Sequence, residues 1–195
     1  SDLSHMLAMD AGGRRIFVTN IVDGTLSEID PIRGALVRTI EVAPMIEGLT
    51  ITPDGSQVWV GSNEARTVSV VDAGSGEILE TFAGFGFPYR MAVTPDNRLA
   101  VLVDPASSEI RVVDVASRAE LGRIAVSPDG VVESAEFPGS ASPEGIAMGR
   151  DSRYAYVSLQ GRNEAAAIDL TTLEIVTTYP TGVWPDGIGY SPHRR

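Results

Sequence analysis

A repeat of 42 residues runs through this sequence, and it constrains the fold more than any other feature. One marker of the repeat is an Asp that closes an alternating apolar run, and it occurs at Asp30, Asp72, Asp114 and Asp169. A second marker is a turn position, and it is occupied by Gly12, Asp54, Asp96 and Asp151. Both series have spacings of 42, 42 and 55 residues, so an insertion of 13 residues lies in the last interval. Two markers that keep one register indicate a repeat protein.

Each unit of the repeat is predicted to form four short strands joined by turns. In the second unit the predicted strands are residues 49–52, 57–61, 67–72 and 78–82. No segment has a convincing helical period. A unit of about 40 to 45 residues with four antiparallel strands is typical of a β-propeller blade, whose apolar faces are covered by neighbouring blades. The predicted fold is therefore all-β, a β-propeller of about four four-stranded antiparallel blades plus the first strand of a fifth.

The whole sequence, residues 1–195, is predicted to be a single partial propeller domain. The predicted blades are residues 4–43, 44–86, 87–126 and 143–181, with a partial blade at 182–192 and an insertion loop at 127–142. The insertion is rich in Gly, Ser and Pro, which indicates an irregular loop. It is a candidate lid or docking element if it lies on the ligand face, and the alternative is an inert surface loop.

Composition narrows the classes of partner. The 26 acidic residues outnumber the 15 basic ones and give a formal net charge of −11, which disfavours a nucleic-acid partner. Cysteine is absent, which excludes disulfides, thiolate metal sites and a cysteine nucleophile, and which fits an exported protein. No apolar run approaches the roughly 20 residues of a membrane helix, and residues 1–20 lack the pattern of a signal peptide.

The second strands of three units follow turns of the PDG type and carry a common motif. The motif reads FVTN at 17–20, WVGS at 59–62 and YVSL at 156–159. These segments resemble the YVTN family of β-propeller repeats, and the resemblance covers essentially the whole chain. The proline-glycine lead-in of that family is matched at 143–145 and 185–187, whereas the third unit departs from it at 88–90.

The resemblance implies a surface-layer or periplasmic protein and a seven-bladed ring about twice as long as this sequence. On this basis the chain is predicted to be the C-terminal portion of a longer propeller, with the remaining blades supplied by missing residues or by another chain. Two other arrangements stay open: about four blades that close alone, and two chains that share one ring. The sequence does not identify the ligand, the oligomeric state or the total number of blades.

In a propeller, the loops that lead into each first strand share a face with the loops between second and third strands, and ligands usually bind on that face. The first loop set provides the candidate ligand-binding residues His5, Glu47, Tyr89, Arg90, Glu144, Trp184 and Asp186. The second loop set provides Asn20, Asn63, Asp104 and Gln160. No catalytic residue is predicted.

His5 and the acidic lead-in residues each have two interpretations. His5 is an axial metal ligand or a general base, or else a surface residue at the start of a strand, and Ser4-His5-Met6 also resembles an expression-tag junction. Glu47, Glu144 and Asp186 occupy equivalent lead-in positions. They either surround a divalent cation or serve turn formation.

The aromatic and basic candidates also have two interpretations. Trp184 and Tyr89 stack on a ligand, or Trp184 covers the lead-in of the last blade. Arg90 holds an anionic group, or it forms a salt bridge to Glu47 or Glu144.

Motifs for common enzyme classes are missing from the sequence, namely a nucleophile elbow, zinc-ligand spacing, a Walker loop, a dinucleotide fingerprint and a haem site. This favours a non-catalytic, secreted or periplasmic scaffold that binds a ligand or protein partner on the loop face. The alternative is a propeller enzyme or enzyme subunit, either a lactonase-like hydrolase or a propeller associated with a quinoprotein dehydrogenase. No cofactor is predicted, although a divalent cation on the loop face stays open.

The repeat also gives three structural expectations. Equivalent second-strand positions, predicted to be buried, are Phe17, Trp59, Val101 and Tyr156. The Asp that closes each third strand is expected to accept backbone hydrogen bonds from the following turn. Residues 187–191 are expected to add as a strand to a missing segment, to the first blade or to another chain.

Overall fold

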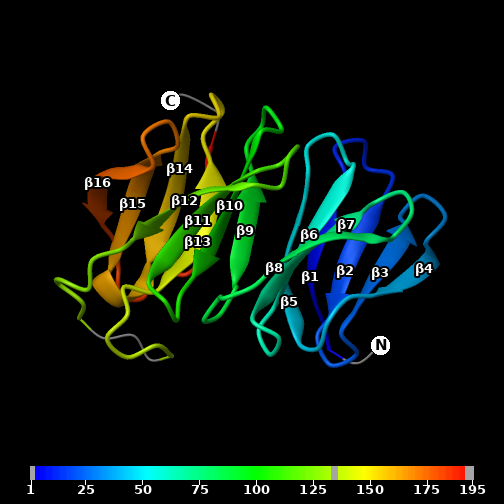
Figure 1. Ribbon diagram of the computed structural model, residues 1–195, viewed down its shortest axis with the longest axis horizontal. Coiled ribbons are helices and arrows are strands. Elements are labelled where there is room, and N and C mark those ends of the chain that lie inside the picture. Colours follow the sequence, from blue (N-terminus) through cyan, green and yellow to red (C-terminus); the bar gives the residue numbers. More distant parts are fainter. Residues whose placement is uncertain (1–2, 133–135, 192–195) are drawn as a thin grey trace. The chain divides into compact units, whose positions relative to one another are not determined.

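The computed structural model describes residues 3–132 and 136–191, and these form four antiparallel sheets of four strands each (Figure 1). The first sheet contains β1 (Ser4–Met9), β2 (Ile16–Asn20), β3 (Thr25–Asp30) and β4 (Ala35–Glu41). The second contains β5 (Ile46–Ile51), β6 (Gln57–Ser62), β7 (Thr67–Asp72) and β8 (Ile78–Phe82). The third contains β9 (Arg90–Val93), β10 (Leu99–Asp104), β11 (Glu109–Asp114) and β12 (Glu120–Ala125). The fourth contains β13 (Pro143–Met148), β14 (Tyr154–Leu159), β15 (Glu164–Asp169) and β16 (Glu174–Pro180).

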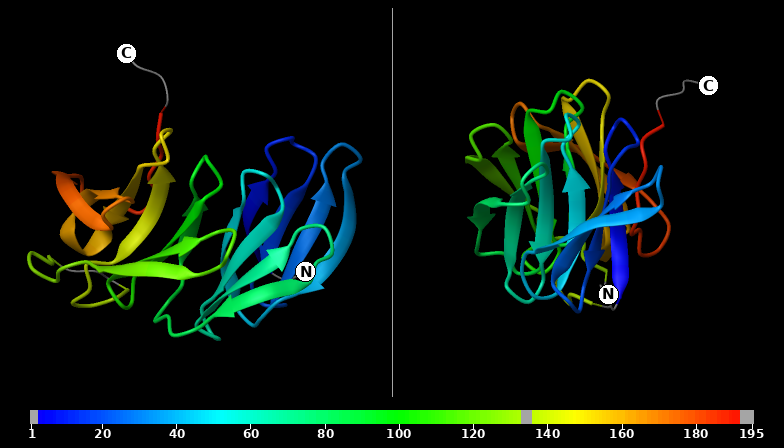
Figure 2. Two further views of the ribbon diagram at one scale, coloured as in Figure 1. Left: turned by 45° about the horizontal axis from the view of Figure 1, so that its top comes forward. Right: turned by 90° about the vertical axis from the view of Figure 1, so that its right-hand side faces the viewer.

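Within every sheet the strands lie side by side in chain order. The left view of Figure 2 shows this most clearly for the blue strands of the first sheet. We call the sheets blades 1 to 4. One helical turn, the 3-10 helix η1 (Gln160–Arg162), follows β14. The chain divides into two compact units, unit 1 (Ser1–Met91) and unit 2 (Ala92–Arg195), which are described separately below. The all-β prediction of four-stranded antiparallel blades is therefore confirmed.

The strands of blade 2 show where the sequence pattern failed. β7 and β8 match the prediction, whereas β5 begins at Ile46, three residues before the predicted start. The register of β5 against β6 shifts between Ile46 and Leu49, which is a β-bulge. A bulge interrupts the alternation of side chains, so a period-two pattern does not reveal the strand that continues through it.

One face of blade 1 is covered by blade 2, and its opposite face is exposed. Phe17 and Leu26 point toward blade 2 and pack against a set that includes Leu49 and Val58 of that blade. On the opposite face Leu7 is 65% exposed, although the equivalent residue of blade 2, Leu49, is 4% exposed beneath blade 1. Blade 1 therefore leaves open an apolar face of the kind that blade 2 has covered.

The second-strand prediction is confirmed. Phe17, Trp59 and Val101 are fully buried, and Tyr156 is half-buried. Each lies in the second strand of its blade, and Phe17, Trp59 and Tyr156 pair with the first strand at Ala8, Thr50 and Ala147. The spacings of 42, 42 and 55 residues thus place these four residues at the same second-strand position in every blade.

The Asp that closes each third strand accepts backbone hydrogen bonds from the next turn, as expected. Oδ1 of Asp72 accepts from the N–H groups of Gly74 at 2.9 Å and Ser75 at 2.7 Å. The same bonds form from Ile32 and Arg33 to Asp30, from Ser117 to Asp114 and from Thr171 to Asp169. The backbone N–H of Ser75 holds the pKa of Asp72 below its usual value, because a donor at the carboxylate favours the charged form.

This arrangement predicts acid sensitivity. A lowered folded-state pKa stabilises the fold at pH values above the unfolded pKa of about 3.9, and the stabilisation is lost as the pH falls through the folded value. Asp30, Asp72, Asp114 and Asp169 all have lowered pKa values. We expect the free energy of unfolding to be flat above about pH 5 and to fall below about pH 4.

The substitution Asp72→Ala isolates one of these turns. It removes both bonds to Gly74 and Ser75 and should lower the free energy of unfolding at pH 7 by about 1 kcal/mol, as the loss of a capping side chain does. The variant should also lose part of the stability change between pH 7 and pH 3, measured by urea unfolding at both values. An unaltered pH dependence in the variant would contradict the role of this carboxylate.

Residues 185–191 form no strand in the structure, so the predicted ladder over 187–191 is not observed. This segment instead lies against blade 4: Ser158 Oγ accepts from Gly145 N–H at 2.7 Å and donates to the carbonyl of Asp186 at 2.6 Å. Further along, the rings of Tyr190 and Tyr156 are stacked at 6.0 Å. The described residues offer no free second strand for it to pair with, so it packs without a ladder.

An equivalent arrangement in unit 1 shows which position the segment takes. Thr19 Oγ1 accepts from the N–H of Met6 at 3.1 Å and donates to the carbonyl of Glu47, where β5 starts, at 3.3 Å. Thr19 and Glu47 are the repeat equivalents of Ser158 and Asp186. Residues 186–190 therefore lie on blade 4 as the first strand of blade 2 lies on blade 1.

Candidate functional site

Each blade has one edge where its first strand begins and its second strand ends, and we call it the lead-in edge. A β-bulge lies there in three blades, between Ser4 and Leu7, between Ile46 and Leu49 and between Pro143 and Ile146. The bulges contain the candidates His5, Glu47 and Glu144. Because a bulge re-aims the side chains that it contains, this edge is built to present them differently from the rest of the strand.

Two residues before each of these candidates, and two residues before Asp186, the backbone adopts a left-handed conformation. The positive φ angles are 60° at Leu3, 52° at Met45, 47° at Ser142 and 54° at Trp184. The spacing of the four positions follows the repeat. This conformation costs a non-glycine residue about 1 kcal/mol or more, so four occurrences at one repeat position indicate a constraint that the fold maintains.

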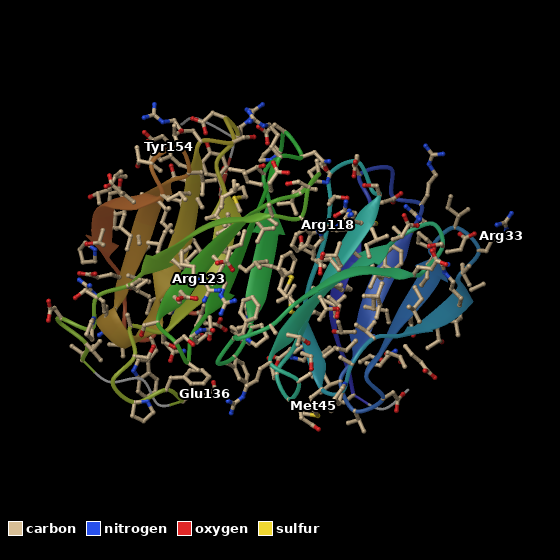
Figure 3. All side chains as sticks on the ribbon, viewed as in Figure 1. Arg33, Met45, Arg118, Arg123, Glu136 and Tyr154 are labelled. Atoms are coloured by element: carbon tan, nitrogen blue, oxygen red, sulfur yellow. The ribbon has the colours of Figure 1, made fainter. Side chains whose placement is uncertain are left out.

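Three of these left-handed residues are large, apolar and exposed. Leu3 is 63% exposed, Met45 40% and Trp184 52%, whereas Ser142 is buried. Loops of the lead-in edge also carry Val22, Val132 and Val183, each at least half exposed. Within residues 3–132 and 136–191, the turns at the opposite ends of the strands carry one large exposed apolar residue, Ile32. In Figure 3, Met45 lies at the lower end of β5 and Arg33, beside Ile32, lies well above it.

In unit 1 the structure brings together three of the predicted residues, Glu47, His5 and Asn63. Oε2 of Glu47 accepts a hydrogen bond from Asn63 Nδ2 at 2.7 Å, and Oε1 lies 3.7 Å from His5 Nδ1. Oδ1 of Asn63 is buried and has no hydrogen-bond partner. His5 is 45% exposed at its side chain and Glu47 is 18% exposed. The cluster is a small, open polar site that joins blade 1 to blade 2.

The other unit 1 candidates have different surroundings. Arg90 lies over the ring of Tyr89 at 4.8 Å and donates to its hydroxyl at 3.2 Å. Asn20 is only 1% exposed, and its side chain bonds to Ser4 and to the hydroxyls of Thr25 and Ser27. These bonds close the loop between β2 and β3.

In unit 2, two candidates are buried. Asp104 is fully buried and accepts from the N–H of Ser107 at 3.2 Å, which closes the loop after β10. Glu144 is 4% exposed and accepts from the hydroxyl of Ser142 at 2.9 Å. Gln160 donates its backbone N–H to Ser142 at 2.9 Å. Beside this network, insertion residues 137–140 line a hollow with 106–108.

The last two candidates lie in the segment that follows β16. Trp184 is 52% exposed, and its backbone N–H donates to Asn163 Oδ1 at 2.9 Å, so the backbone of this residue is held in place. Asp186 uses its carbonyl to accept from Ser158. Its backbone therefore holds the segment on blade 4.

No group of three or more His, Asp or Glu side chains that could hold a metal ion occurs among residues 3–132 and 136–191. Glu47 belongs to unit 1 and Glu144 and Asp186 belong to unit 2, so the divalent cation among these three residues stays a prediction. The part of the chain that the structure describes also holds no helix long and apolar enough to cross a membrane.

The family model of the choice-of-anchor I domain matches residues 23–186. The chain belongs to the choice-of-anchor I family. Membership indicates an extracellular or cell-surface protein, in line with the expected export. The matched model is not that of the YVTN repeat, so the propeller part of the resemblance is confirmed and its finer assignment is not.

The choice-of-anchor I chain is similar to "Seven-bladed beta-propeller protein Rv1057" of Mycobacterium tuberculosis, with 30% identity over 156 residues. The match covers 77% of this chain and 36% of that protein, so the chain spans about a third of the relative's length. Among solved structures it resembles the Cps50 (Swd1) β-propeller domain of Myceliophteria thermophila, with a TM-score of 0.77 at 16% identity over 94% of this chain and 57% of that one. Kuenenia stuttgartiensis hydrazine synthase gives 0.60 at 15% identity, over 95% and 89%. At these identities the structural matches establish the fold alone.

Sequence reasoning did not identify Leu3, Met45 and Val22 of this choice-of-anchor I chain as surface residues. Large apolar residues are usually buried, so the local sequence does not indicate that these are exposed. A signal was nevertheless present, because positions 3, 45 and 184 share one place in the repeat and all hold large apolar residues.

Proposed function

We propose that this chain is part of an exported β-propeller scaffold that binds a protein partner along the lead-in edge of its blades. The observation that carries the proposal is the repeated left-handed position whose side chains, Leu3, Met45 and Trp184, are large, apolar and exposed. The left-handed backbone and the exposure of apolar side chains to water each lower the stability of the fold. Features that cost stability in this way are typical of interaction sites.

Variation within the repeat supports the same proposal. Positions that serve the fold repeat one residue, as Asp30, Asp72 and Asp114 do. The repeat position that lies in the bulges of blades 1, 2 and 4 instead holds His5, Glu47, Tyr89, Glu144 and Asp186 in turn. A position whose chemistry changes from blade to blade suits the recognition of an irregular protein surface, with these residues as a polar surround to the apolar ones.

We further propose that the four blades belong to a larger ring of the surface-layer or periplasmic type, seven-bladed as the mycobacterial relative is named. The open apolar face of blade 1 and the segment 186–190 seated on blade 4 both favour further blades. These blades come from other residues of the same polypeptide or from another chain. Their pairing with residues 187–191 stays a prediction.

The binding proposal is tested by selecting peptides from a displayed library against the chain and comparing variants. Met45→Ser should weaken the selected peptides by about tenfold, the usual effect of truncating a central apolar contact. Ile32→Ser, which removes a 79% exposed residue in a turn at the other end of the strands, should leave affinity unchanged. Failure to select any peptide, or equal affinity for the Met45→Ser variant, would contradict the proposal.

A further inference from the structure

In unit 1 the guanidinium group of Arg15 in blade 1 is held by two backbone carbonyls of blade 2. Arg15 Nη1 donates to the carbonyl of Ala73 at 2.7 Å, and Nη2 donates to the carbonyl of Gly55 at 2.6 Å. Both acceptors lie in turns at the ends of the strands opposite the lead-in edge, which we call the turn edge. A planar guanidinium whose N–H donors form a rigid fork fits such a pair of acceptors.

Unit 2 has a hollow of about 210 Å³ at the turn edge, between blades 3 and 4. Its lining includes the repeat equivalents of Arg15, Gly55 and Ala73, which are Leu99, Ser152 and Leu170. Tyr154, two residues after Ser152, marks this end of the strands in Figure 3. A leucine replaces only the apolar stem of an arginine. The hollow therefore lies where unit 1 has a guanidinium group.

The backbone beside the hollow has the same arrangement as in unit 1. Gly55 and Ser152 both have a positive φ, of 72° and 59°. The N–H groups of Ala73 and Leu170 donate, each at 2.8 Å, to the carbonyl of the residue that follows Gly55 or Ser152. The carbonyls of Ser152 and Leu170 are therefore placed as those of the two acceptors in unit 1 are.

Unit 2 fills the place of the other arginine of unit 1 by itself. Arg38 Nη2 also donates to the carbonyl of Ala73, at 2.8 Å. Its repeat equivalent in blade 3 is Gly122, and a Cβ atom there would lie 2.7 Å from the end of the Leu173 side chain. Leu173 thus occupies the space that Arg38 has in unit 1, and the hollow has room for one guanidinium group.

The charges at the hollow are compatible with a cation. In unit 1 the carboxylate of Glu28 lies 4.0 Å from Arg15 Nη1. Blade 3 has an apolar residue at the position of Glu28, but Asp96 lines the hollow and supplies a carboxylate. Arg98 lines the hollow as well. The repeat equivalent of Arg98 is Arg14, which directly precedes Arg15, so unit 1 holds its guanidinium with a second arginine next to it in the chain.

We infer that this hollow takes the guanidinium group of an arginine side chain that a partner protein supplies. The carbonyls of Ser152 and Leu170 accept its N–H groups, and Asp96 provides the opposite charge. A lysine fits less well because its ammonium group is compact and strongly hydrated. The site lies at the turn edge, so the inference goes beyond the proposed binding along the lead-in edge and does not depend on it.

The test titrates three probes, N-acetylarginine amide, N-acetyllysine amide and N-acetylcitrulline amide, into the isotope-labelled chain and follows the amide NMR shifts. The arginine derivative should shift the amides of Asp96, Ser152 and Thr171. The lysine derivative keeps the charge without the fork, and the citrulline derivative keeps the shape without the charge. Each should bind at least tenfold more weakly. Equal binding of either, or shifts located elsewhere, would overturn the inference.

Substitutions make the test specific for the hollow. Leu99→Arg copies unit 1 and should abolish binding of the arginine derivative, whereas Ala65→Arg adds the same charge to an exposed loop of blade 2 and should leave binding intact. Asp96→Asn should weaken binding about tenfold. Its control is Asp54→Asn, because both carboxylates accept at 2.6 Å from the Thr hydroxyl two residues earlier. Unaltered affinity in a folded Leu99→Arg variant, or in Asp96→Asn, would contradict the assignment.

The reciprocal variant, Arg15→Leu, gives unit 1 the residue that unit 2 has. It should acquire a second site, at which the arginine derivative shifts the amides of Gly55 and Ala73. Arg33→Leu removes an 83% exposed arginine and should acquire none. If Arg15→Leu gains no site, the pair of carbonyls does not hold a guanidinium and the inference is wrong. If library peptides respond to Met45→Ser while the arginine derivative does not bind, this inference alone fails.

Discussion

The substitution Glu28→Ala is expected to lower the free energy of unfolding by about 3 to 5 kcal/mol, because it removes the anion from a buried charge network. Glu28 is 5% exposed. Its carboxylate accepts from Arg38 Nε at 2.6 Å and lies 4.0 Å from Arg15 Nη1. Without it, two guanidinium groups would remain partly buried beside each other with no carboxylate between them.

The two arginines also join blade 1 to blade 2, which makes the network more consequential than an ordinary pair. Arg15 donates to the carbonyls of Ala73 at 2.7 Å and Gly55 at 2.6 Å, and Arg38 donates to Ala73 at 2.8 Å. Glu28 orients both donors toward these carbonyls. Its loss therefore weakens the contact between the two blades of unit 1 as well as the pair itself.

A matched control separates this network from surface electrostatics. Arg33→Ala breaks the 2.9 Å pair with Asp30, in which Arg33 is 83% exposed, and exposed pairs contribute about 0 to 1 kcal/mol. Urea unfolding at pH 7, followed by the fluorescence of buried Trp59, measures both variants. Glu28→Gln should fall between them because it keeps an acceptor for Arg38. Equal, small losses for Glu28→Ala and Arg33→Ala would show that the network does not hold the blades.

The sequence predicted well the buried second-strand positions and the turn aspartates, which repeat in every blade. Phe17 and its equivalents and Asp72 and its equivalents serve the same packing or turn in each blade, so one pattern located them all. The strand alternation was readable wherever the ladder is regular, as in β7. These features follow from local rules that the sequence states several times over.

The lead-in edge was harder to predict because its geometry breaks those rules. The bulge at Glu47 ends the alternation, and the left-handed residue before it, Met45, belongs to a class that rarely adopts positive φ. Asn20 and Asp104 were expected on the ligand face, yet they are 1% and 0% exposed. A polar residue at a strand end looks the same in sequence whether it closes its own loop or meets a ligand.

The substitution Gly48→Ala is expected to cost about 3 kcal/mol, at the upper end of what overpacking costs. A Cβ atom on Gly48 would meet the carbonyl oxygen of Tyr89, and it would lie 3.1 Å from the end of the Met91 side chain. A Cβ atom added to the nearby Gly61 would lie 2.5 Å from the carbonyl oxygen of Pro88. The two glycines let residues 88–91 pass directly over blade 2, and a backbone obstacle cannot rotate away as a side chain can.

The repeat shows that the neighbour, and not the local backbone, requires glycine at this position. Met6 is the equivalent residue in blade 1 and carries a full side chain, and φ at Gly48 is not in the left-handed region. In the variant Gly145→Ala, the added Cβ atom would likewise meet the carbonyl oxygen of Asp186. Residues 185–191 form no strand, however, so they can move aside. This substitution should therefore cost only about 1 kcal/mol and speed the amide exchange of Ile188 and Tyr190.

Gly187→Ala is the control for both substitutions, since its added Cβ would have nothing within 4 Å. Urea unfolding should then rank the losses of stability as Gly48→Ala first, Gly145→Ala second and Gly187→Ala near zero. Faster exchange near residue 188 should accompany only the Gly145 variant, because only that substitution pushes on the segment held by Ser158. If Gly48→Ala and Gly187→Ala unfolded at the same urea concentration, residues 88–91 could not lie against Gly48 as described.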